Sequence, residues 1–153
     1  MSSAYAARAS TTPDLSRSGR GGGWVVAQLV LFALIVGSWF FGPGVTRLGW
    51  IVALTGAVVA GAAMRAMGRS FTAFPVPKPD GELIVEGPYS MMRHPMYVGG
   101  VFFFAGLSFV FSAWGLVLTG VLALFWVAKA HREERYLLER FRSYPAYRRR
   151  TWF

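Results

Sequence analysis

The sequence predicts an all-α integral membrane protein with about four transmembrane helices, the last two of which form a helical hairpin. Hydrophobic residues occupy 54% of its 153 positions, a larger share than an ordinary soluble domain of this length contains. Long apolar runs separate short segments that hold the charged residues. A helix needs about 20 apolar residues to cross a bilayer. We therefore expect one membrane domain at residues 24–153, preceded by a tail at 1–23.

The first apolar run, residues 24–41, has no charged residue and has a tryptophan near each end. At about 1.5 Å per residue, the run is just long enough to cross the hydrocarbon core as a helix. A cleaved signal peptide is the alternative, but three arginines precede the run and no small-residue cleavage pattern clearly follows it. Residues 1–23 lack apolar periodicity and are expected to form a disordered cytoplasmic tail.

A second helix is expected at residues 48–68. This run is rich in Gly and Ala, and its small residues Gly56, Ala60 and Ala63 recur at helical spacing. Small side chains allow two membrane helices to approach closely. We expect this face to pack against a neighbouring helix, while the long side chain of Arg65 extends to the membrane interface.

The third apolar run, residues 98–130, is too long for one straight helix and is interrupted by SAWG at residues 112–115. The economical interpretation is a helical hairpin with helices at 95–111 and 114–140. Pro95 then occupies the first helical position, where its missing N–H costs nothing. A re-entrant hairpin that never reaches the far side of the membrane is the alternative.

The basic residues indicate the orientation. All of them except Arg47 lie in or beside the tail, the loop between the second and third helices, and the C-terminal segment. The positive-inside rule places these segments and both termini in the cytoplasm. All seven acidic residues and both histidines fall on the same side. Any polar chemistry is therefore expected at the cytoplasmic face.

Composition also limits the classes of function. The absence of cysteine excludes a thiolate nucleophile, a Cys-ligated zinc or iron–sulfur cluster and a disulfide framework. The net charge of +9 is compatible with nucleic acid binding, but basic residues between long apolar runs more commonly serve topology and anionic headgroups. We expect membrane lipids as partners and no nucleic acid.

A stiff loop, SFTAFPVPKPDGELIVEGPYSMMRHPMY, joins the second and third helices. Its prolines favour extended backbone, and ELIVE at residues 82–86 is expected to be a short strand-like piece. Arg93 and His94 stand directly before Pro95. Binding of lipid phosphates explains such a pair as well as catalysis does, and capping of the following helix is a further alternative for His94.

The C-terminal segment, from residue 126 onward, is expected to leave the membrane as an amphipathic helix that continues to about residue 140. Lys129 and Glu133 lie one turn apart, and Glu133 shares a face with Leu137. Charged pairs at this spacing stabilise a helix by only about 0.2–0.5 kcal/mol. A purely structural role for Glu133 is therefore the alternative to a functional one.

The two cytoplasmic segments carry linked motifs. The loop ends in GELIVEGPYSMMRHPMYVGG, which contains G-x-Y and R-H-P-x-Y-x-G, and the C-terminal segment contains EERYLLERF followed by Tyr144 and Tyr147. This arrangement resembles the isoprenylcysteine carboxyl methyltransferase family of integral membrane methyltransferases, which is related to phospholipid methyltransferases. The resemblance extends from about residue 70 to residue 147, across the expected hairpin.

The resemblance implies methyl transfer from S-adenosylmethionine to a lipophilic acceptor, with S-adenosylhomocysteine as the product. The cofactor is expected between the loop and the C-terminal helix, and the tail of the acceptor enters from the bilayer. The cofactor-binding residues implied by position are Glu82, Leu83, Ile84, Tyr89, His94, Pro95, Met96, Tyr97 and Glu133. Arg93 is placed to hold the acceptor or the methionyl carboxylate of the cofactor, and Lys129 is placed at the acceptor. Lys129 stands where many family members have an arginine. An arginine is able to bind a carboxylate through two parallel hydrogen bonds, and a lysine is not.

The implied chemistry needs few reactive side chains. A sulfonium methyl group is already electrophilic, so an ionised carboxylate acceptor, which is the expected type, needs only positioning and partial desolvation. No metal is expected. An amine or hydroxyl acceptor needs a base, for which His94 and Glu134 are the candidates. The expected catalytic residues are therefore Arg93, His94 and Glu134.

Two other functions remain possible from the sequence. A membrane reductase of the steroid reductase type resembles this chain in its C-terminal helices and loops, and it would bind NADPH instead of an adenosyl cofactor. A non-catalytic membrane subunit would use its basic end to bind anionic lipid or a partner protein, and alanine at Arg93 or Glu133 would leave its role intact. Binding of the two cofactors distinguishes these functions.

Overall fold

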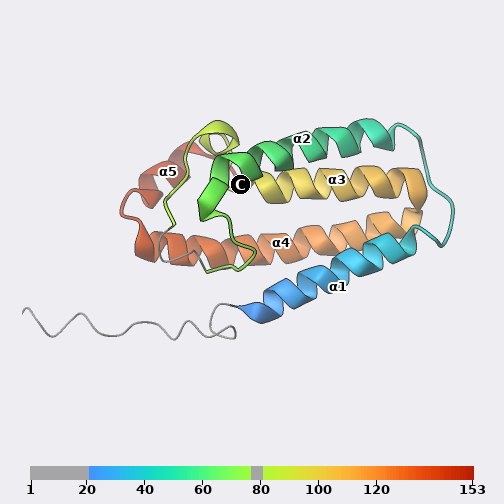
Figure 1. Ribbon diagram of the computed structural model, residues 1–153, viewed down its shortest axis with the longest axis horizontal. Coiled ribbons are helices and arrows are strands. Elements are labelled where there is room, and N and C mark those ends of the chain that lie inside the picture. The colour runs from blue at the N-terminus through green and yellow to red at the C-terminus, as the bar shows by residue number, and fades with distance from the viewer. Residues whose placement is uncertain (1–20, 77–80) are drawn as a thin grey trace, which may run out of the picture.

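The computed structural model describes residues 21–76 and 81–153, and all regular structure in these residues is helical (Figure 1). The predicted all-α class is therefore confirmed for the described residues. The expected tail lies outside them except at its end, where α1 already begins. In chain order the elements are α1 (Gly22–Ser38), α2 (Gly49–Met67), the short 3-10 helices η1 (Gly68–Ser70) and η2 (Gly87–Ser90), α3 (Pro95–Phe111), α4 (Ala113–Arg140) and α5 (Tyr144–Arg150).

The ends of the helices follow from local hydrogen bonding. Helix α1 stops at Ser38, three residues before the expected end, because the chain tightens there: the N–H of Phe41 donates to the carbonyl of Ser38, 3.0 Å away, three residues back. Helix α3 starts at Pro95, as expected. Ser112 alone separates α3 from α4, so the hairpin turns at the predicted SAWG break.

The strand-like piece expected at residues 82–86 does not form. These residues have no regular structure, and the described residues contain no β-strand and a single isolated bridge between Met92 and Trp152. A strand needs a partner strand to be stable, and the backbone here binds side chains instead. The N–H of Glu82 donates to Ser70 Oγ at 3.2 Å, and the Arg140 guanidinium donates to the carbonyl of Gly81 at 3.2 Å.

Helices α2 and α3 lie in very close contact through small residues. A methyl group added at Gly56 would lie 2.2 Å from the backbone nitrogen of Phe103, and one added at Gly99 would lie 2.5 Å from that of Ala60. Ala63, one turn further along, is completely buried. The predicted packing face of the second helix is confirmed, and its partner is α3.

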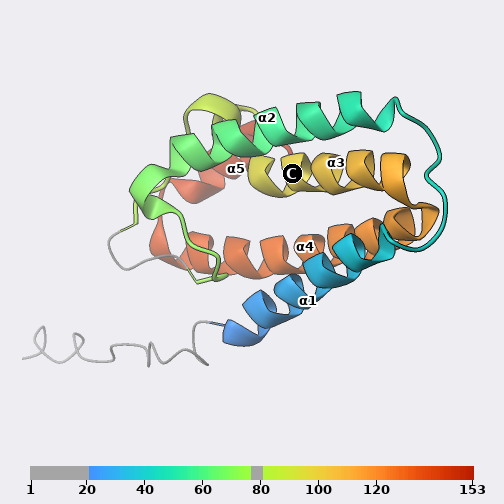
Figure 2. The same cartoon turned by 45° about the vertical axis from the view of Figure 1, so that its right-hand side comes forward.

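Helix α1 packs against α4 instead of α2. Figures 1 and 2 show α1 crossing α4 obliquely, on the side of the bundle away from α2. Bulky side chains fill the contact: Ile35 and Leu122 are fully buried, and the ring of Phe32 meets that of Trp126 of α4 edge to face, at 6.0 Å between centroids. The bundle therefore has one tight helix pair, α2 and α3, and one looser pair, α1 and α4.

The surface of the bundle is apolar. Helix α2, continued by η1 to Ser70, and helix α4 are each long and apolar enough to cross a membrane. Helices α1 and α3 are apolar too but have 17 residues each. Large apolar side chains such as Leu54 are exposed along these helices. The protein is thus suited to association with a membrane, while crossing by four helices and the re-entrant alternative stay predictions.

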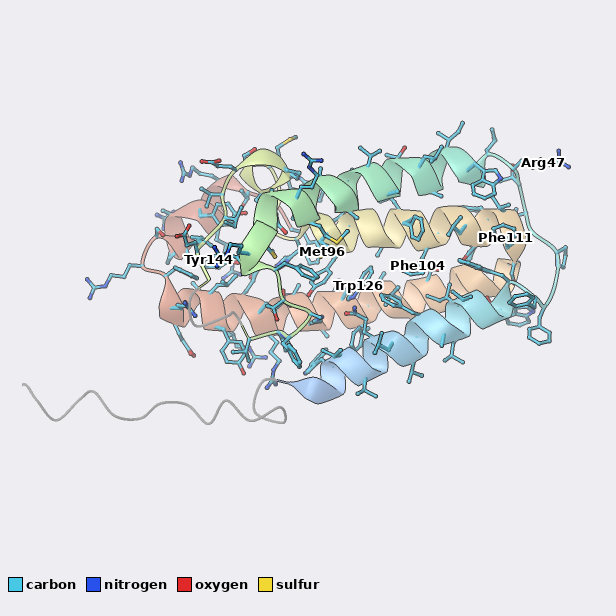
Figure 3. All side chains as sticks on the ribbon, in the orientation of Figure 1. Arg47, Met96, Phe104, Phe111, Trp126 and Tyr144 are labelled. Atoms are coloured by element: carbon cyan, nitrogen blue, oxygen red, sulfur yellow. The ribbon has the colours of Figure 1, made fainter. Side chains whose placement is uncertain are left out.

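The two ends of the bundle differ in character. At one end, the loop between α1 and α2 is tied to the hairpin turn, since the N–H groups of Val45 and Thr46 both donate to the carbonyl of Phe109 at 2.7 and 2.9 Å. Arg47 projects from this loop (Figure 3). At the other end lie α5, the loop after α2 and most of the charged side chains, including those of the predicted site.

Candidate active site

A short turn brings the RHP motif to α4. Gly87 has a φ of 58°, in the left-handed region that glycine adopts without strain, and it opens η2. Within η2 the ring of Tyr89 is buried. Pro95 then starts α3, so Arg93 and His94 stand at the N-terminal end of α3, opposite the polar end of α4. His94 occupies the N-cap position but its side chain makes no capping hydrogen bond, so the capping alternative is wrong.

Glu133 faces the interior of the bundle. Its Oε1 accepts a hydrogen bond of 2.5 Å from the hydroxyl of Tyr97, and its Oε2 lies 3.8 Å from Nδ1 of His94. The Tyr97 ring stacks between those of His94 and Trp126, with centroid distances of 5.6 and 5.2 Å. A carboxylate is thus held against a row of three aromatic rings, an environment that favours a cationic group.

The neighbouring Glu134 points to another face of α4. Its Oε1 accepts a hydrogen bond of 2.7 Å from Arg93 Nε and lies 3.4 Å from Nε2 of His94, while its Oε2 lies 3.5 Å from Arg148 Nε. Arg93 also donates through Nη1 to the carbonyl of Thr151 at 2.7 Å. Glu134 therefore joins the RHP motif to the C-terminal segment, and every one of its close partners is a basic side chain.

Lys129 lies one turn before Glu133 and is buried, with 2% of its surface exposed. Its Nζ donates to Oε1 of Gln28 at 2.9 Å and to the carbonyl of Ala73 at 2.8 Å. The same Gln28 oxygen accepts a hydrogen bond of 3.1 Å from Nε1 of Trp126. A side chain from α1 thereby contacts two side chains of α4, and this contact lies next to the Tyr97 ring, 5.5 Å from Nζ.

Three tyrosines close the polar end. The hydroxyl of Tyr147 donates to the carbonyl of Tyr89 at 2.7 Å. Tyr144 is buried, and its hydroxyl has no hydrogen-bond partner among the described residues. Burial raises the pKa of Tyr147 to about 12 and also raises the pKa values of Tyr89 and Tyr144. The three phenols are therefore protonated at neutral pH, and each has an O–H group that is able to donate a hydrogen bond.

Most of these groups, but not Glu134, line one cavity of about 410 Å³, a size typical of small-molecule sites. Its apolar end lies among the helices, at Phe32, Ala60, Met64, Gly100, Phe104 and Trp126. Its polar end lies under the loops, at Glu82, Tyr89, Arg93, His94, Glu133 and Tyr144. Figure 3 shows Tyr144, Met96, Trp126 and Phe104 in a row between the two helix pairs, along this axis.

The cavity brings together most of the residues singled out in the sequence. Those that line it are Glu82, Leu83, Ile84, Tyr89, Arg93, His94, Met96, Tyr97, Lys129 and Glu133. Pro95 and Glu134 do not line it. Pro95 is buried at the start of α3, and Glu134 is held by basic side chains on another face of α4.

Sequence reasoning did not assign Gln28, Trp126 or Tyr144 to the site, although all three line the cavity. A signal existed for Gln28, because an amide inside an otherwise apolar run is costly in a membrane and indicates a functional contact. Trp126 offered no such signal, since a tryptophan near a helix end is common at a membrane interface. The unpaired hydroxyl of Tyr144 is visible only in three dimensions.

The fold and the cavity define a membrane-associated helical protein whose cavity has a polar end and an apolar end, as a site for an amphiphilic ligand requires. The chain belongs to the phospholipid methyltransferase family of membrane methyltransferases, which it matches over residues 45–143. This match covers α2, α3 and α4 together with the loop that carries the RHP motif. Helix α1 lies outside it.

Two curated relatives are known by their roles in metal resistance. The nickel-cobalt-cadmium resistance protein NccN of Alcaligenes xylosoxydans xylosoxydans is 33% identical over 131 residues, which are 83% of this chain and 59% of that protein. The cobalt-zinc-cadmium resistance protein CzcN of Cupriavidus metallidurans is 32% identical over 139 residues, 86% of this chain and 61% of that protein. The chain thus spans about three fifths of the length of these relatives. No solved structure matches it.

Proposed function

We propose that the protein transfers the methyl group of S-adenosylmethionine to the carboxylate of a lipophilic acceptor. The observation that carries this proposal is the position of the Glu133 carboxylate in a two-ended cavity of a phospholipid methyltransferase family member. The polar end suits a polar cofactor, and the apolar end suits a hydrocarbon chain. Glu133 and the Tyr97 ring lie where the two would meet.

The residues at the polar end fit S-adenosylmethionine. The carboxylate of Glu133 is able to accept hydrogen bonds from ribose hydroxyls or to pair with a positive centre, and the rings of His94, Tyr97 and Trp126 favour a cation nearby. The buried hydroxyl of Tyr144 has no partner among the described residues, so a ligand oxygen or nitrogen would satisfy it. Leu83 and Ile84 have irregular backbone outside any sheet and line the cavity, whereas the N–H of Glu82 already donates to Ser70.

The apolar end fits the chain of the acceptor, since it is lined by aromatic rings, methionine and small residues. When bound, S-adenosylmethionine supplies a methyl group to an acceptor carboxylate oxygen, with the electrons of the broken carbon–sulfur bond passing to sulfur to give a methyl ester and S-adenosylhomocysteine. This reaction moves no proton. The task of the protein is therefore to hold two ligands in line and to exclude water.

The basic residues of the motif have distinct parts in this proposal. Arg93 lines the cavity but uses Nε and Nη1 on Glu134 and on carbonyls of the C-terminal segment, which leaves Nη2 for a ligand among its described contacts. His94, which also lines the cavity, is the group placed to accept a proton if the acceptor is an amine or a hydroxyl. We assign Glu134 to positioning of Arg93 and His94 and not to proton transfer, because it does not reach the cavity.

The charge distribution supports a cytoplasmic site. Among the residues that the structure describes, Arg47 is the one charged residue at the end of the bundle opposite the cavity, and the other described arginines and lysines belong to segments at the cavity end. The positive-inside rule then places the cavity mouth and both termini in the cytoplasm. We propose that the cofactor enters from the cytoplasm and the acceptor from the membrane.

The names of NccN and CzcN raise the question of metal binding. The described part of this chain has no group of three or more His, Asp or Glu side chains placed to hold a metal ion. We propose that any contribution of this protein to metal resistance comes through modification of a lipid-like molecule and not through a metal site in the described residues.

Calorimetric titration of the full chain in detergent tests the proposed function. S-adenosylmethionine and S-adenosylhomocysteine are expected to bind saturably, and Glu133→Gln is expected to weaken binding by about tenfold or more, because hydrogen bonds to a charged group contribute about 1.5–3 kcal/mol. Glu139→Gln is the matched control, since Glu139 lies on the same helix but is exposed. Binding of NADPH, with no binding of the adenosyl ligands, would instead support the reductase. If the folded protein binds neither NADPH nor the adenosyl ligands, both the methyltransferase and the reductase are contradicted.

A further inference from the structure

Lys129 is a buried cation that makes no salt bridge in the described part of the chain, although Glu133, one turn further along α4, acts on it electrostatically. Its two hydrogen-bond acceptors, the amide oxygen of Gln28 and the carbonyl of Ala73, are both neutral. No carboxylate lies within 4.0 Å of its ammonium in the described part of the chain. Burial of a charge that has no directly bonded counterion is unfavourable. The nearby Arg93 shows the usual arrangement, because its guanidinium contacts a carboxylate of the protein itself.

Gln28 also has unused hydrogen-bonding capacity. The two groups that contact its side chain, Nζ of Lys129 and Nε1 of Trp126, are both pure donors. The amide oxygen must therefore face them, and this fixes the orientation of the amide. Its NH2 group then donates to no described residue. One of the three protons of the Lys129 ammonium is likewise uncommitted.

These two donors lie where the ends of the cavity meet. On α1, Phe32 follows Gln28 by one turn and lines the apolar end; on α4, Glu133 follows Lys129 by one turn and lines the polar end. Nζ of Lys129 lies 5.5 Å from the centre of the Tyr97 ring, whose hydroxyl contacts Glu133. A ligand group bound here would have a hydrocarbon chain on one side and the cofactor on the other.

We propose that Gln28 and Lys129 form an anion subsite, which binds the carboxylate head of a single-chain amphiphile and gives the enzyme its preference for an anionic acceptor. This inference rests on the proposed function and names the determinant of its substrate class. The ligand anion compensates the Lys129 charge, and the Gln28 NH2 group contributes a second donor. Gln28 belongs to α1, outside residues 45–143, so this determinant is supplied by a helix that the family match does not include.

A panel of ligands with one chain length and different heads tests the subsite. Myristate, tetradecyl phosphate, tetradecylamine and tetradecanol are titrated calorimetrically into the full chain in detergent, with saturating S-adenosylhomocysteine. We expect myristate to bind about tenfold or more tightly than the amine and the alcohol. Comparison of tetradecyl phosphate with myristate tells whether the subsite selects a carboxylate or binds any anionic head. Equal affinities for all four ligands would overturn the proposal.

Two substitutions of Gln28 separate ligand binding from a structural role. Gln28→Glu keeps an oxygen for Lys129 and Trp126 but compensates the charge of the lysine, so it is expected to remove the preference for myristate. Gln28→Met loses the NH2 donor but leaves Lys129 charged, so it is expected to retain part of that preference. If Gln28 only supports the fold, the order is reversed, because Glu preserves both hydrogen bonds and Met loses them. That reversed order would overturn the proposal.

Binding of S-adenosylhomocysteine to each variant serves as the check on folding and as the separate test of the cofactor site. Affinities within about twofold of the unsubstituted protein are expected, since Gln28 lies on the acceptor side of the cavity. A variant that loses the preference for myristate but still binds S-adenosylhomocysteine is altered in the anion subsite alone. Failure of the unsubstituted protein to bind S-adenosylhomocysteine contradicts the proposed function, whatever the ligand panel shows.

Discussion

The two helix pairs of the bundle are built in opposite ways. Helices α2 and α3 touch through glycine, so closely that a methyl group at Gly106 would lie 2.2 Å from the backbone nitrogen of Ala53. Helices α1 and α4 are held apart by large side chains, among them Trp24 and Phe125, whose rings lie 5.1 Å apart. The first pair leaves no room for a ligand. The cavity extends into the space beside the second pair, and the polar contact of Gln28 with Lys129 lies there.

This difference indicates that the two helix pairs have different roles. A contact of backbone against backbone is rigid, because no side-chain rotation is able to relieve a collision. Such a contact fixes the position of the RHP motif at the start of α3. A contact through bulky side chains adapts more easily, since the rings have rotational freedom. The α1–α4 side is therefore the one that adapts more easily to ligands of different shape.

The largest expected effect comes from a methyl group in the tight pair. Gly56→Ala is expected to lower the free energy of unfolding by about 2–3 kcal/mol, because the nearest atoms are backbone atoms of α3. Gly61→Ala on the same helix is the control: nothing lies within 4 Å of its added methyl group, and alanine favours the helix by about 0.8–1.0 kcal/mol. Thermal unfolding in detergent, followed by circular dichroism, measures both. Equal midpoints for the two variants would contradict the description of α2 and α3 as a rigid pair.

The second effect concerns the two adjacent glutamates of α4, of which Glu134 binds basic side chains of the protein and Glu133 lines the cavity. Glu134→Gln is expected to lower the free energy of unfolding by about 2 kcal/mol, since it removes a charged partner of Arg93. Affinity for S-adenosylhomocysteine is expected to fall less than in Glu133→Gln, because Glu134 does not line the cavity. Unfolding and calorimetric titration give the two values. A stable Glu134→Gln protein that has lost adenosyl binding would show that Glu134 contacts the ligand.

The smallest expected effect comes from the same methyl group placed beside the looser pair. At Gly100 the added carbon would lie 2.5 Å from Cη2 of Trp126, a side-chain atom that is able to move. We expect Gly100→Ala to cost about 1 kcal/mol of stability and to weaken myristate binding, because the displaced indole pulls away from Gln28. Gly120→Ala, with open space around its methyl group, is the control. A loss of stability equal to that of Gly56→Ala would remove the distinction between the two pairs.

Much of the fold was accessible from apolar runs and helix-breaking residues. Pro95 marked the start of α3, and the SAWG break marked the hairpin, because each acts on the few backbone hydrogen bonds around it. The small residues of α2 identified its packing face, although not its partner. The strand-like reading of residues 82–86 was wrong, since an apolar segment of five residues becomes a strand only where another strand lies alongside.

The candidate site was predictable in part. Its motif residues gather at one cavity because they stand at the ends of helices that the hairpin brings together. The different surroundings of Glu133 and Glu134 were not predictable, since adjacent residues on a helix differ only by rotation about its axis and the neighbours of each face come from distant segments. Tyr97 reaches Glu133 across 36 residues, and Arg93 reaches Glu134 across 41.

The sequence by itself determined the helical class, the apolar surface and the collection of polar residues at one end, because these depend on composition and on short-range periodicity. Only the tertiary structure decided that Gln28 of α1 meets Lys129 of α4 and that Glu134 binds Arg93 instead of facing the cavity. It also decided that the buried Tyr144 hydroxyl finds no partner among the described residues. These contacts depend on which helices are neighbours and how they are rotated. Packing of the whole chain sets both, and no local stretch of sequence encodes either.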